Sequence, residues 1–172
     1  YALREAGTRK GPPIVAMVGR VAPIKDVKTF IRAARMVTEV LPDVRFKVLG
    51  GVDEDESYAE ECERLVRVLN LKPVFEFTGA VKMADYYPNL SCVVLTSISE
   101  AQPFVLLEAM RVGIPVVATT VGACAELVLG THGTDEALGE CGVMTNIRSP
   151  RETADAILAI LKNPERAKRM GE

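Results

Sequence analysis

The chain has no tryptophan, a single histidine and few aromatic residues of any kind. Aromatic side chains make up 5% of the 172 residues, so no platform for stacking nucleic-acid bases is evident. The formal net charge is −2 at pH 7, and the chain therefore lacks the positive excess of a nucleic-acid surface. Together these absences argue against nucleic acid as a partner.

Metal-binding and disulfide patterns are also missing. The four cysteines (Cys62, Cys92, Cys124 and Cys141) are widely spaced and form no Cys-x-x-Cys pair, and only His132 could join them. This composition disfavours a zinc site. Cys92 and Cys141 fall in or beside apolar runs, which is typical of small core residues. Reduced thiols in a cytosolic protein fit this pattern better than disulfides do.

No apolar run of the sequence is long enough to cross a bilayer. The chain begins with Tyr1 rather than Met and shows no signal peptide, so we expect it to be part of a longer protein. We expect residues 1–13 to be a linker from a missing N-terminal lobe, because they end in Gly-Pro-Pro. Residues 14–172 are expected to form one lobe, since an apolar fraction of 48% suffices for a core.

Apolar runs and helical patterns alternate along the chain. Strands are predicted over residues 14–18, 44–49, 74–78, 92–96, 115–118 and 143–146. Helices are predicted over residues 27–41, 58–69, 83–87, 103–112, 123–129, 150–161 and 165–170. Because the strands consist of apolar runs rather than alternating patterns, they indicate a parallel sheet covered on both faces. With right-handed crossovers this predicts an α/β fold, a doubly wound parallel sheet in a Rossmann-like lobe.

Several helix boundaries carry capping signals. Asp26 is expected to cap the first helix, and Ser57 with Glu60 matches a capping box for the second. We expect the acidic residues among 53–56 to interact with the N-terminus of that second helix rather than with a metal. Pro103 is expected in the first turn of the helix that follows the fourth strand.

Ligands of such folds bind beyond the carboxyl ends of the strands. Gly19, Arg20 and Lys25 follow the first predicted strand. An arginine fork and a lysine point charge suit phosphate oxygens, and the helix beginning at Pro103 adds free backbone donors. These residues predict a phosphate site. The sequence has neither Gly-x-Gly-x-x-Gly after the first strand nor a P-loop, which disfavours NAD binding and P-loop chemistry.

Two carboxylates lie near the same predicted edge. Glu100 follows the fourth strand in a loop, and Glu108 lies eight positions later in an otherwise apolar helix. A charged side chain on a buried face must be paired or bound to something. Carboxylates accept hydrogen bonds from sugar hydroxyls, so these two indicate a sugar and a ribose. With the phosphate site they predict a nucleotide-sugar site.

A structural role is open for each residue taken alone. Gly19 can end a strand, the two cations can lie in a solvated loop, Glu100 can cap a helix and Glu108 can face solvent. Four such charged residues, two cations and two anions, at corresponding strand ends argue against coincidence. We interpret the remaining polar candidates, Ser97, Ser99 and His132, as structural. No Ser-His-Asp arrangement is present in the sequence.

At these residues the chain resembles the C-terminal lobe of the retaining glycosyltransferases of family 4, which have the GT-B architecture. The family pattern has Gly-Arg and a later Lys after the first strand, as in Gly19, Arg20 and Lys25. It continues with Glu-x7-Glu running into Glu-Ala-Met and Gly-x-Pro-Val-Val-Ala, as in residues 100–118. A narrower likeness, to exopolysaccharide glycosyltransferases of bacteria, rests on residues 19–30, 95–100 and 121–124.

The resemblance implies a UDP-sugar as donor substrate, with no metal and no cofactor. It implies that Arg20 and Lys25 hold the diphosphate, that Glu100 contacts the donor sugar and that Glu108 contacts the ribose. The candidate catalytic residues are thus Arg20, Lys25 and Glu100. The candidate substrate-binding residues are Gly19, Ala80, Gln102, Phe104, Val105 and Glu108. The backbone of residues 79–81 would face the base.

The chain departs from the family pattern at three positions. Many members have glycine where this chain has Ala101 and Pro103, and Asp26 replaces the common glycine after the lysine. Because Pro103 has no backbone N–H, we expect phosphate contacts from Phe104 or Val105 instead.

The expected function is the donor-binding half of a retaining glycosyltransferase that transfers a hexose from a UDP-sugar to a growing polysaccharide. The acceptor would bind through the missing N-terminal lobe, so the chain alone is expected to be inactive. The full protein is expected in the cytoplasm, at the inner face of the membrane if it joins a membrane-associated polysaccharide-synthesis complex.

Two alternatives remain open. One is a GT-B sugar-nucleotide epimerase or phosphorylase, which the lack of an acid/base histidine at the rim disfavours. The other is a non-catalytic nucleotide-binding or scaffolding lobe, which the departures at Ala101 and Pro103 keep open.

Overall fold

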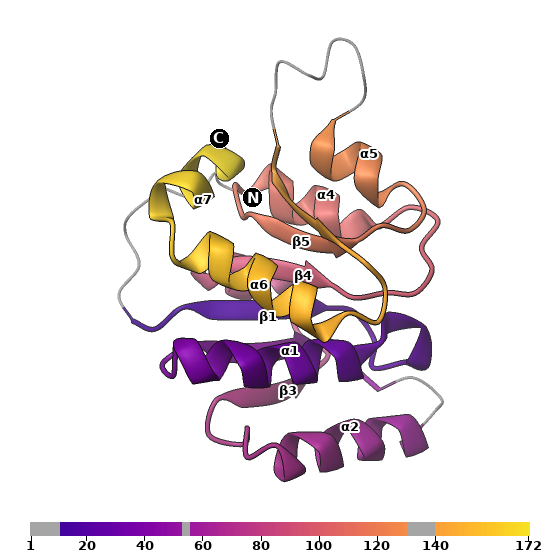
Figure 1. The fold of residues 1–172 in the computed structure, drawn as a ribbon. Coiled ribbons are helices and arrows are strands. Elements are labelled where there is room, and N and C mark those ends of the chain that lie inside the picture. Colours follow the sequence, from indigo (N-terminus) through magenta and orange to yellow (C-terminus); the bar gives the residue numbers. More distant parts are fainter. Residues whose placement is uncertain (1–10, 53–55, 131–139) are drawn as a thin grey trace.

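The structure, a computed structural model, describes residues 11–52, 56–130 and 140–172. Its centre is a six-stranded sheet in the order β3-β2-β1-β4-β5-β6, and every neighbouring pair is parallel (Figure 1). The strands are β1 (Ile14–Val18), β2 (Arg45–Leu49), β3 (Phe75–Gly79), β4 (Cys92–Leu95), β5 (Val116–Thr119) and β6 (Gly142–Thr145). This order reverses direction between β1 and β4, which confirms the doubly wound Rossmann-like fold.

Helices cover the sheet in two layers (Figure 1). They are α1 (Val27–Val40), α2 (Glu56–Val68), α3 (Met83–Tyr86), α4 (Phe104–Arg111), α5 (Cys124–Leu129), α6 (Pro150–Leu161) and α7 (Pro164–Gly171). Two short 3-10 turns accompany them, η1 (Pro23–Lys25) and η2 (Tyr87–Asn89). One core joins α1, α2 and α6 to one face of the sheet, and a second core joins α4 and α5 to the other.

The strands differ in how completely they are buried. Every residue of β4 and β5 is buried, as the prediction of apolar runs requires. In β2, however, Phe46 and Val48 are buried while Arg45 and Lys47 are only half-buried. The second face of the sheet is therefore covered only in part at β2, where Leu49 is buried but Arg45 and Lys47 are not, and Glu76 is exposed in β3. The connection from β3 to β4 carries only the short elements α3 and η2, which are too small to cover this part of the second face.

The capping predictions had mixed outcomes. Asp26 caps α1 as expected, because its side chain accepts from the backbone N–H of Thr29 at 3.3 Å. The capping box at Ser57 is wrong, since α2 begins at Glu56 and Ser57 lies in its first turn. Pro103 is the N-cap residue of α4, outside the helix, with φ −82° and ψ 85°. Residues 1–10 of the expected linker lie outside the described residues, and so do residues 53–55 of the acidic stretch before α2.

The backbone at Asp26 explains one departure from the family pattern. Its φ is +45°, in the left-handed region where glycine is usual. Aspartate tolerates this region better than most side chains, and its carboxylate also accepts from the Thr29 hydroxyl at 2.7 Å. The helical cap thus compensates for the lost glycine.

No helix in the described ranges is long and apolar enough to span a membrane.

Candidate functional site

The loop after β1 is held against the ends of two other strands. Gly19 has φ +143°, and its N–H donates to the carbonyl of Leu49 at the end of β2. A Cβ at Gly50 would lie 2.1 Å from the Gly19 carbonyl oxygen, so only glycine permits this approach. Further along the loop, the Ile24 carbonyl accepts from the N–H of Ile98 at 2.9 Å. The loop after β1 is therefore tied to the loop after β4.

This tie brings two predicted site residues together. Lys25 Nζ lies 2.6 Å from Glu100 Oε1, and the two side chains are 23% and 12% exposed. Ser97 Oγ donates to the same carboxylate oxygen, also at 2.6 Å. The sequence analysis predicts that Lys25 binds the phosphates and that Glu100 binds the sugar. The structure shows that the two side chains also contact each other.

A glycine of the loop after β5 fixes the backbone beside Glu100. Gly122 has φ +50°, and a Cβ there would lie 1.8 Å from the Glu100 carbonyl oxygen and 3.2 Å from that of Ala101. No other residue type fits between these carbonyls without moving one loop. The backbone of the Glu100 loop is thus set by contact with a neighbouring strand end.

The remaining candidates of these loops are exposed. Arg20 lies beside Gly19, and Gln102 lies between Glu100 and α4. Ala80 follows β3, which is two strands away from β1 in the sheet. A β-bridge between Gly79 and Gly50 joins the ends of β3 and β2. Arg20 and Gln102 thus share the carboxyl edge with the Lys25–Glu100 pair, whereas Ala80 lies farther along it.

Glu108 lies on the exposed side of α4, not on its buried face. Leu106 and Ala109 are the buried residues of that helix, so the premise that Glu108 is a buried charge is wrong. One of its oxygens nevertheless has a hydrogen-bond partner, because the hydroxyl of Tyr87 donates to Oε2 at 2.6 Å. Tyr87 is 1% exposed, and sequence reasoning missed it.

The first backbone N–H groups of α4 differ in whether they are already bonded. The N–H of Phe104 donates to the Gln102 carbonyl at 3.1 Å, and that of Leu106 donates to the Pro103 carbonyl at 3.0 Å. The N–H of Val105 makes no hydrogen bond within the described residues. Of the two donors expected from sequence, Val105 is therefore the one available to a ligand. The Phe104 ring is 67% exposed.

The thiols are not placed for nucleophilic chemistry. Burial raises the pKa of Cys62 to about 11 and also raises the pKa of Cys92, Cys124 and Cys141. Because the thiolate is the reactive form, these side chains are neutral and unreactive at neutral pH. Cys92 is a core residue as expected, whereas Cys141 is half-buried.

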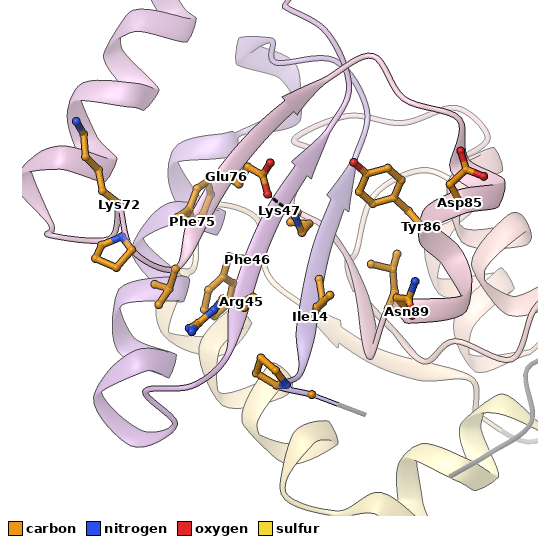
Figure 2. A pocket seen from close by; sticks show the side chains of 15 residues that line it. Ile14, Arg45, Phe46, Lys47, Lys72, Phe75, Glu76, Asp85, Tyr86 and Asn89 are labelled. Carbon is orange, nitrogen blue, oxygen red and sulfur yellow. Dashed lines mark hydrogen bonds and ion pairs between the residues drawn. The ribbon is translucent and has the colours of Figure 1, made fainter. Parts of the chain in front are cut away.

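A groove of about 580 Å³ lies over the amino-terminal parts of β1, β2 and β3, beside α3 (Figure 2). It is bounded by the first residues of the strands, Ile14 of β1, Arg45 of β2 and Phe75 of β3. Lys47 and Glu76 form an ion pair across its floor. Ligands of parallel α/β sheets bind at the carboxyl ends of the strands, so we do not assign the predicted ligand to this groove.

The fold and the carboxyl-edge residues define the chain as an α/β lobe with cations and carboxylates at the carboxyl ends of its parallel strands, where such folds bind ligands. Residues 12–163 match the model of the family described as Glycosyl transferases group 1. The chain belongs to this family.

Similar proteins of known name support the same assignment. The chain is 32% identical to D-inositol 3-phosphate glycosyltransferase of Kribbella flavida, over 99% of this chain and 40% of that protein. It is also 32% identical to alpha-D-kanosaminyltransferase of Streptomyces kanamyceticus, over 99% of this chain and 42% of that protein. The chain thus spans about two fifths of the length of these relatives.

Solved structures show the same fold. HepE of Anabaena in complex with UDP and glucose has a TM-score of 0.82 and 24% identity, over 94% of this chain and 42% of that chain. Sucrose-phosphate synthase of Thermosynechococcus elongatus has a TM-score of 0.78 and 29% identity, over 94% of this chain and 39% of that chain.

Proposed function

We propose that this chain is the donor-binding lobe of a retaining glycosyltransferase that transfers a hexose from a UDP-sugar to a growing polysaccharide. The observation that carries the proposal is the meeting of Lys25 and Glu100 at 2.6 Å on the carboxyl edge of the sheet. Family membership supports it. So does the shared fold with HepE, whose crystal structure holds UDP and glucose.

The proposed roles follow from the chemistry of each group. Arg20 and Lys25 bind the diphosphate and stabilise the charge that builds on it as the hexose departs. An ammonium group has three N–H donors, so Lys25 can keep its bond to Glu100 and still reach phosphate oxygens. Removing one preorganised donor of this kind costs about 3–4 kcal/mol of transition-state stabilisation in other enzymes.

The remaining candidates line the donor around these charges. Glu100 accepts from hydroxyls of the hexose, and Glu108 uses its second oxygen, Oε1, for the ribose. The N–H of Val105 and the positive end of α4 face the phosphates. Gly19 lets the β1 loop approach the donor closely, while Ala80 and Gln102 border the base and the sugar. The proposal requires no cofactor and no metal, because the UDP-sugar is itself a substrate.

The finer parts of the proposal concern the longer protein. The narrower likeness is to the Pel exopolysaccharide glycosyltransferase of bacteria, over residues 19–30, 95–100 and 121–124. We accordingly propose an exopolysaccharide acceptor, bound through an N-terminal lobe, and a cytoplasmic location near a membrane-associated synthesis complex.

A titration of UDP and UDP-hexoses into the chain tests the donor site. We expect UDP to bind with micromolar or higher affinity. Lys25→Ala is expected to lower this affinity about tenfold or more, because a hydrogen bond to a charged group contributes about 1.5–3 kcal/mol. Lys47→Ala is the matched control, because Lys47 also forms an ion pair with a glutamate but in the middle of β2, away from the carboxyl edge. Absence of UDP binding by the unsubstituted chain would contradict the proposal.

The chain alone is predicted to transfer no sugar, since the proposal places the acceptor on another lobe. The measurement is a turnover assay with UDP-hexose and an exopolysaccharide acceptor. Sugar transfer by the 172-residue chain would show that the acceptor site lies within it.

A non-catalytic nucleotide-binding lobe is the second candidate. Pro103 has no N–H, and the N–H of Phe104 is bonded to Gln102, so the start of α4 offers fewer phosphate donors than a glycine-rich sequence would. If UDP binds, an assay of transfer by the longer protein decides between the two functions.

A further inference from the structure

Ser97 is a buried hydroxyl with an unusual partner. It follows β4 and is 0% exposed. A buried hydroxyl without a hydrogen bond is costly, and most side-chain hydrogen bonds go to backbone or water. Ser97 instead donates to the Glu100 carboxylate at 2.6 Å. Its environment therefore gives it a role that the structural interpretation from sequence did not include.

The position of Ser97 is fixed from two sides. The hydroxyl of Thr119, at the end of β5, donates to the Ser97 carbonyl at 2.7 Å. The preceding residue, Thr96, donates to the carbonyls of Lys25 at 2.9 Å and Asp26 at 3.0 Å. Thr96 and Thr119 are also 0% exposed. Ser97 therefore acts from a rigid strand end, which is where a residue can hold another side chain most accurately.

The two oxygens of Glu100 are used unequally. Oε1 accepts from both Ser97 Oγ and Lys25 Nζ, each at 2.6 Å. Within the described residues Oε2 accepts no hydrogen bond, although the side chain is 12% exposed. A carboxylate oxygen can accept more than one donor. Oε2 is thus the oxygen open to a hydroxyl of a ligand.

Lys25 alone could not fix the orientation of the Glu100 carboxylate. The last torsion of a glutamate side chain is broad, so a single flexible lysine would leave the plane of the carboxylate free to turn. Ser97 approaches from the interior on a short side chain with one rotatable bond. With both donors on Oε1, rotation of the carboxylate would break two hydrogen bonds at once.

We propose that Ser97 is a positioning residue: by holding Oε1 of Glu100 from the buried end of β4, it aims Oε2 at the donor hexose and sets the preference of the lobe for a UDP-hexose over UDP. The inference rests on the proposed function. It adds a residue that acts through Glu100 and need not touch the donor.

The test is a titration of the chain with UDP and with UDP-glucose, UDP-galactose and UDP-N-acetylglucosamine. The measured quantity is the ratio of the affinity for the tightest UDP-hexose to that for UDP. Ser97→Ala is expected to lower this ratio about tenfold while the affinity for UDP stays within about twofold. A purely structural serine would lower both affinities together and leave the ratio unchanged.

A double-substitution cycle checks that Ser97 works through Glu100. Glu100→Gln alone is expected to lower the ratio, and adding Ser97→Ala to it is expected to lower the ratio no further. Independent effects in the double variant would overturn the inference. Ser97→Thr keeps the hydroxyl and is expected to keep the ratio even if its melting temperature falls. If Ser97→Ala does not fold, Ser97→Cys, with its weak donor, must lower the ratio in its place.

The matched control is Thr153→Val. Thr153 is also 0% exposed, and its hydroxyl donates to the Ser149 carbonyl within α6 at 2.9 Å. This variant is expected to keep the ratio, and a loss as large as that of Ser97→Ala would overturn the inference. So would an unchanged ratio in Ser97→Ala, or an unsubstituted chain that binds no UDP-hexose more tightly than UDP. If that chain binds no UDP at all, the proposed function itself is wrong.

Discussion

At the scale of single residues, one glycine joins two loops of the candidate site. Gly122 has φ +50°, and a Cβ there would lie 1.8 Å from the Glu100 carbonyl oxygen. We predict that Gly122→Ala lowers the free energy of unfolding by about 2 kcal/mol or more, from backbone strain and overpacking. Gly51→Ala is the control, because nothing lies within 4 Å of a Cβ at Gly51. Denaturant unfolding of both variants measures the difference, and equal stability would contradict this account of the loops.

The buried thiols predict how stability depends on pH. Burial raises the pKa of Cys62 from 9.0 to about 11, so the folded chain holds this proton more tightly than the unfolded chain does. The stabilisation from the neutral thiol is complete below about pH 9 and is lost as the pH rises toward 11. We predict that the free energy of unfolding falls across this range. In Cys62→Ala the fall should be shallower, and an identical slope would show that Cys62 does not contribute.

The site illustrates what residue types alone can predict. Gly19, Lys25 and Glu100 could be chosen from sequence because glycines and charges beside apolar runs mark strand ends. The partners of the two carboxylates could not, because Ser97 resembles any polar residue after a strand and Tyr87 lies 21 positions before Glu108. Nor could the exposed position of Glu108, which depends on the side of α4 that faces the sheet.

At the scale of elements, β2 has one face in the core, and its second face is only half-buried at Arg45 and Lys47. Phe46 is 0% exposed, and its ring lies 5.9 Å from that of Phe30 and 6.2 Å from that of Phe75. We predict that Phe46→Ala lowers the free energy of unfolding by about 3–5 kcal/mol. Lys47→Ala on the other face should cost less than about 1 kcal/mol, since its ion-pair partner Glu76 is 58% exposed. Similar losses in thermal or denaturant unfolding would mean that both faces are packed.

Most of the secondary structure could be predicted because central parallel strands are apolar runs and helices carry a clear period. The errors fall where tertiary context decides. The alternation of Arg45, Phe46 and Lys47 in β2 signals one solvated face, but the sequence does not reveal that the connection from β3 to β4 is too short to cover it. The start of α4 depends on the non-helical ψ of Pro103, which composition does not determine.

At the scale of the whole molecule, the fold separates two regions with different chemistry. The carboxyl edge carries Arg20, Lys25, Glu100 and Glu108, and the groove at the amino edge is floored by the Lys47–Glu76 pair (Figure 2). Because the chain spans about two fifths of its relatives, the proposal assigns the donor to this lobe and the acceptor to another. The proposal therefore depends on whether a nucleotide-sugar binds at the carboxyl edge.

A crystal structure of the chain with a UDP-hexose answers that question most directly. We predict that the diphosphate lies within hydrogen-bonding distance of Arg20 and Lys25, that the ribose contacts Glu108, and that Glu100 Oε2 faces the hexose. Nucleotide bound in the groove beside Arg45 and Lys47, or at the carboxyl edge without contact to Lys25, would contradict the account.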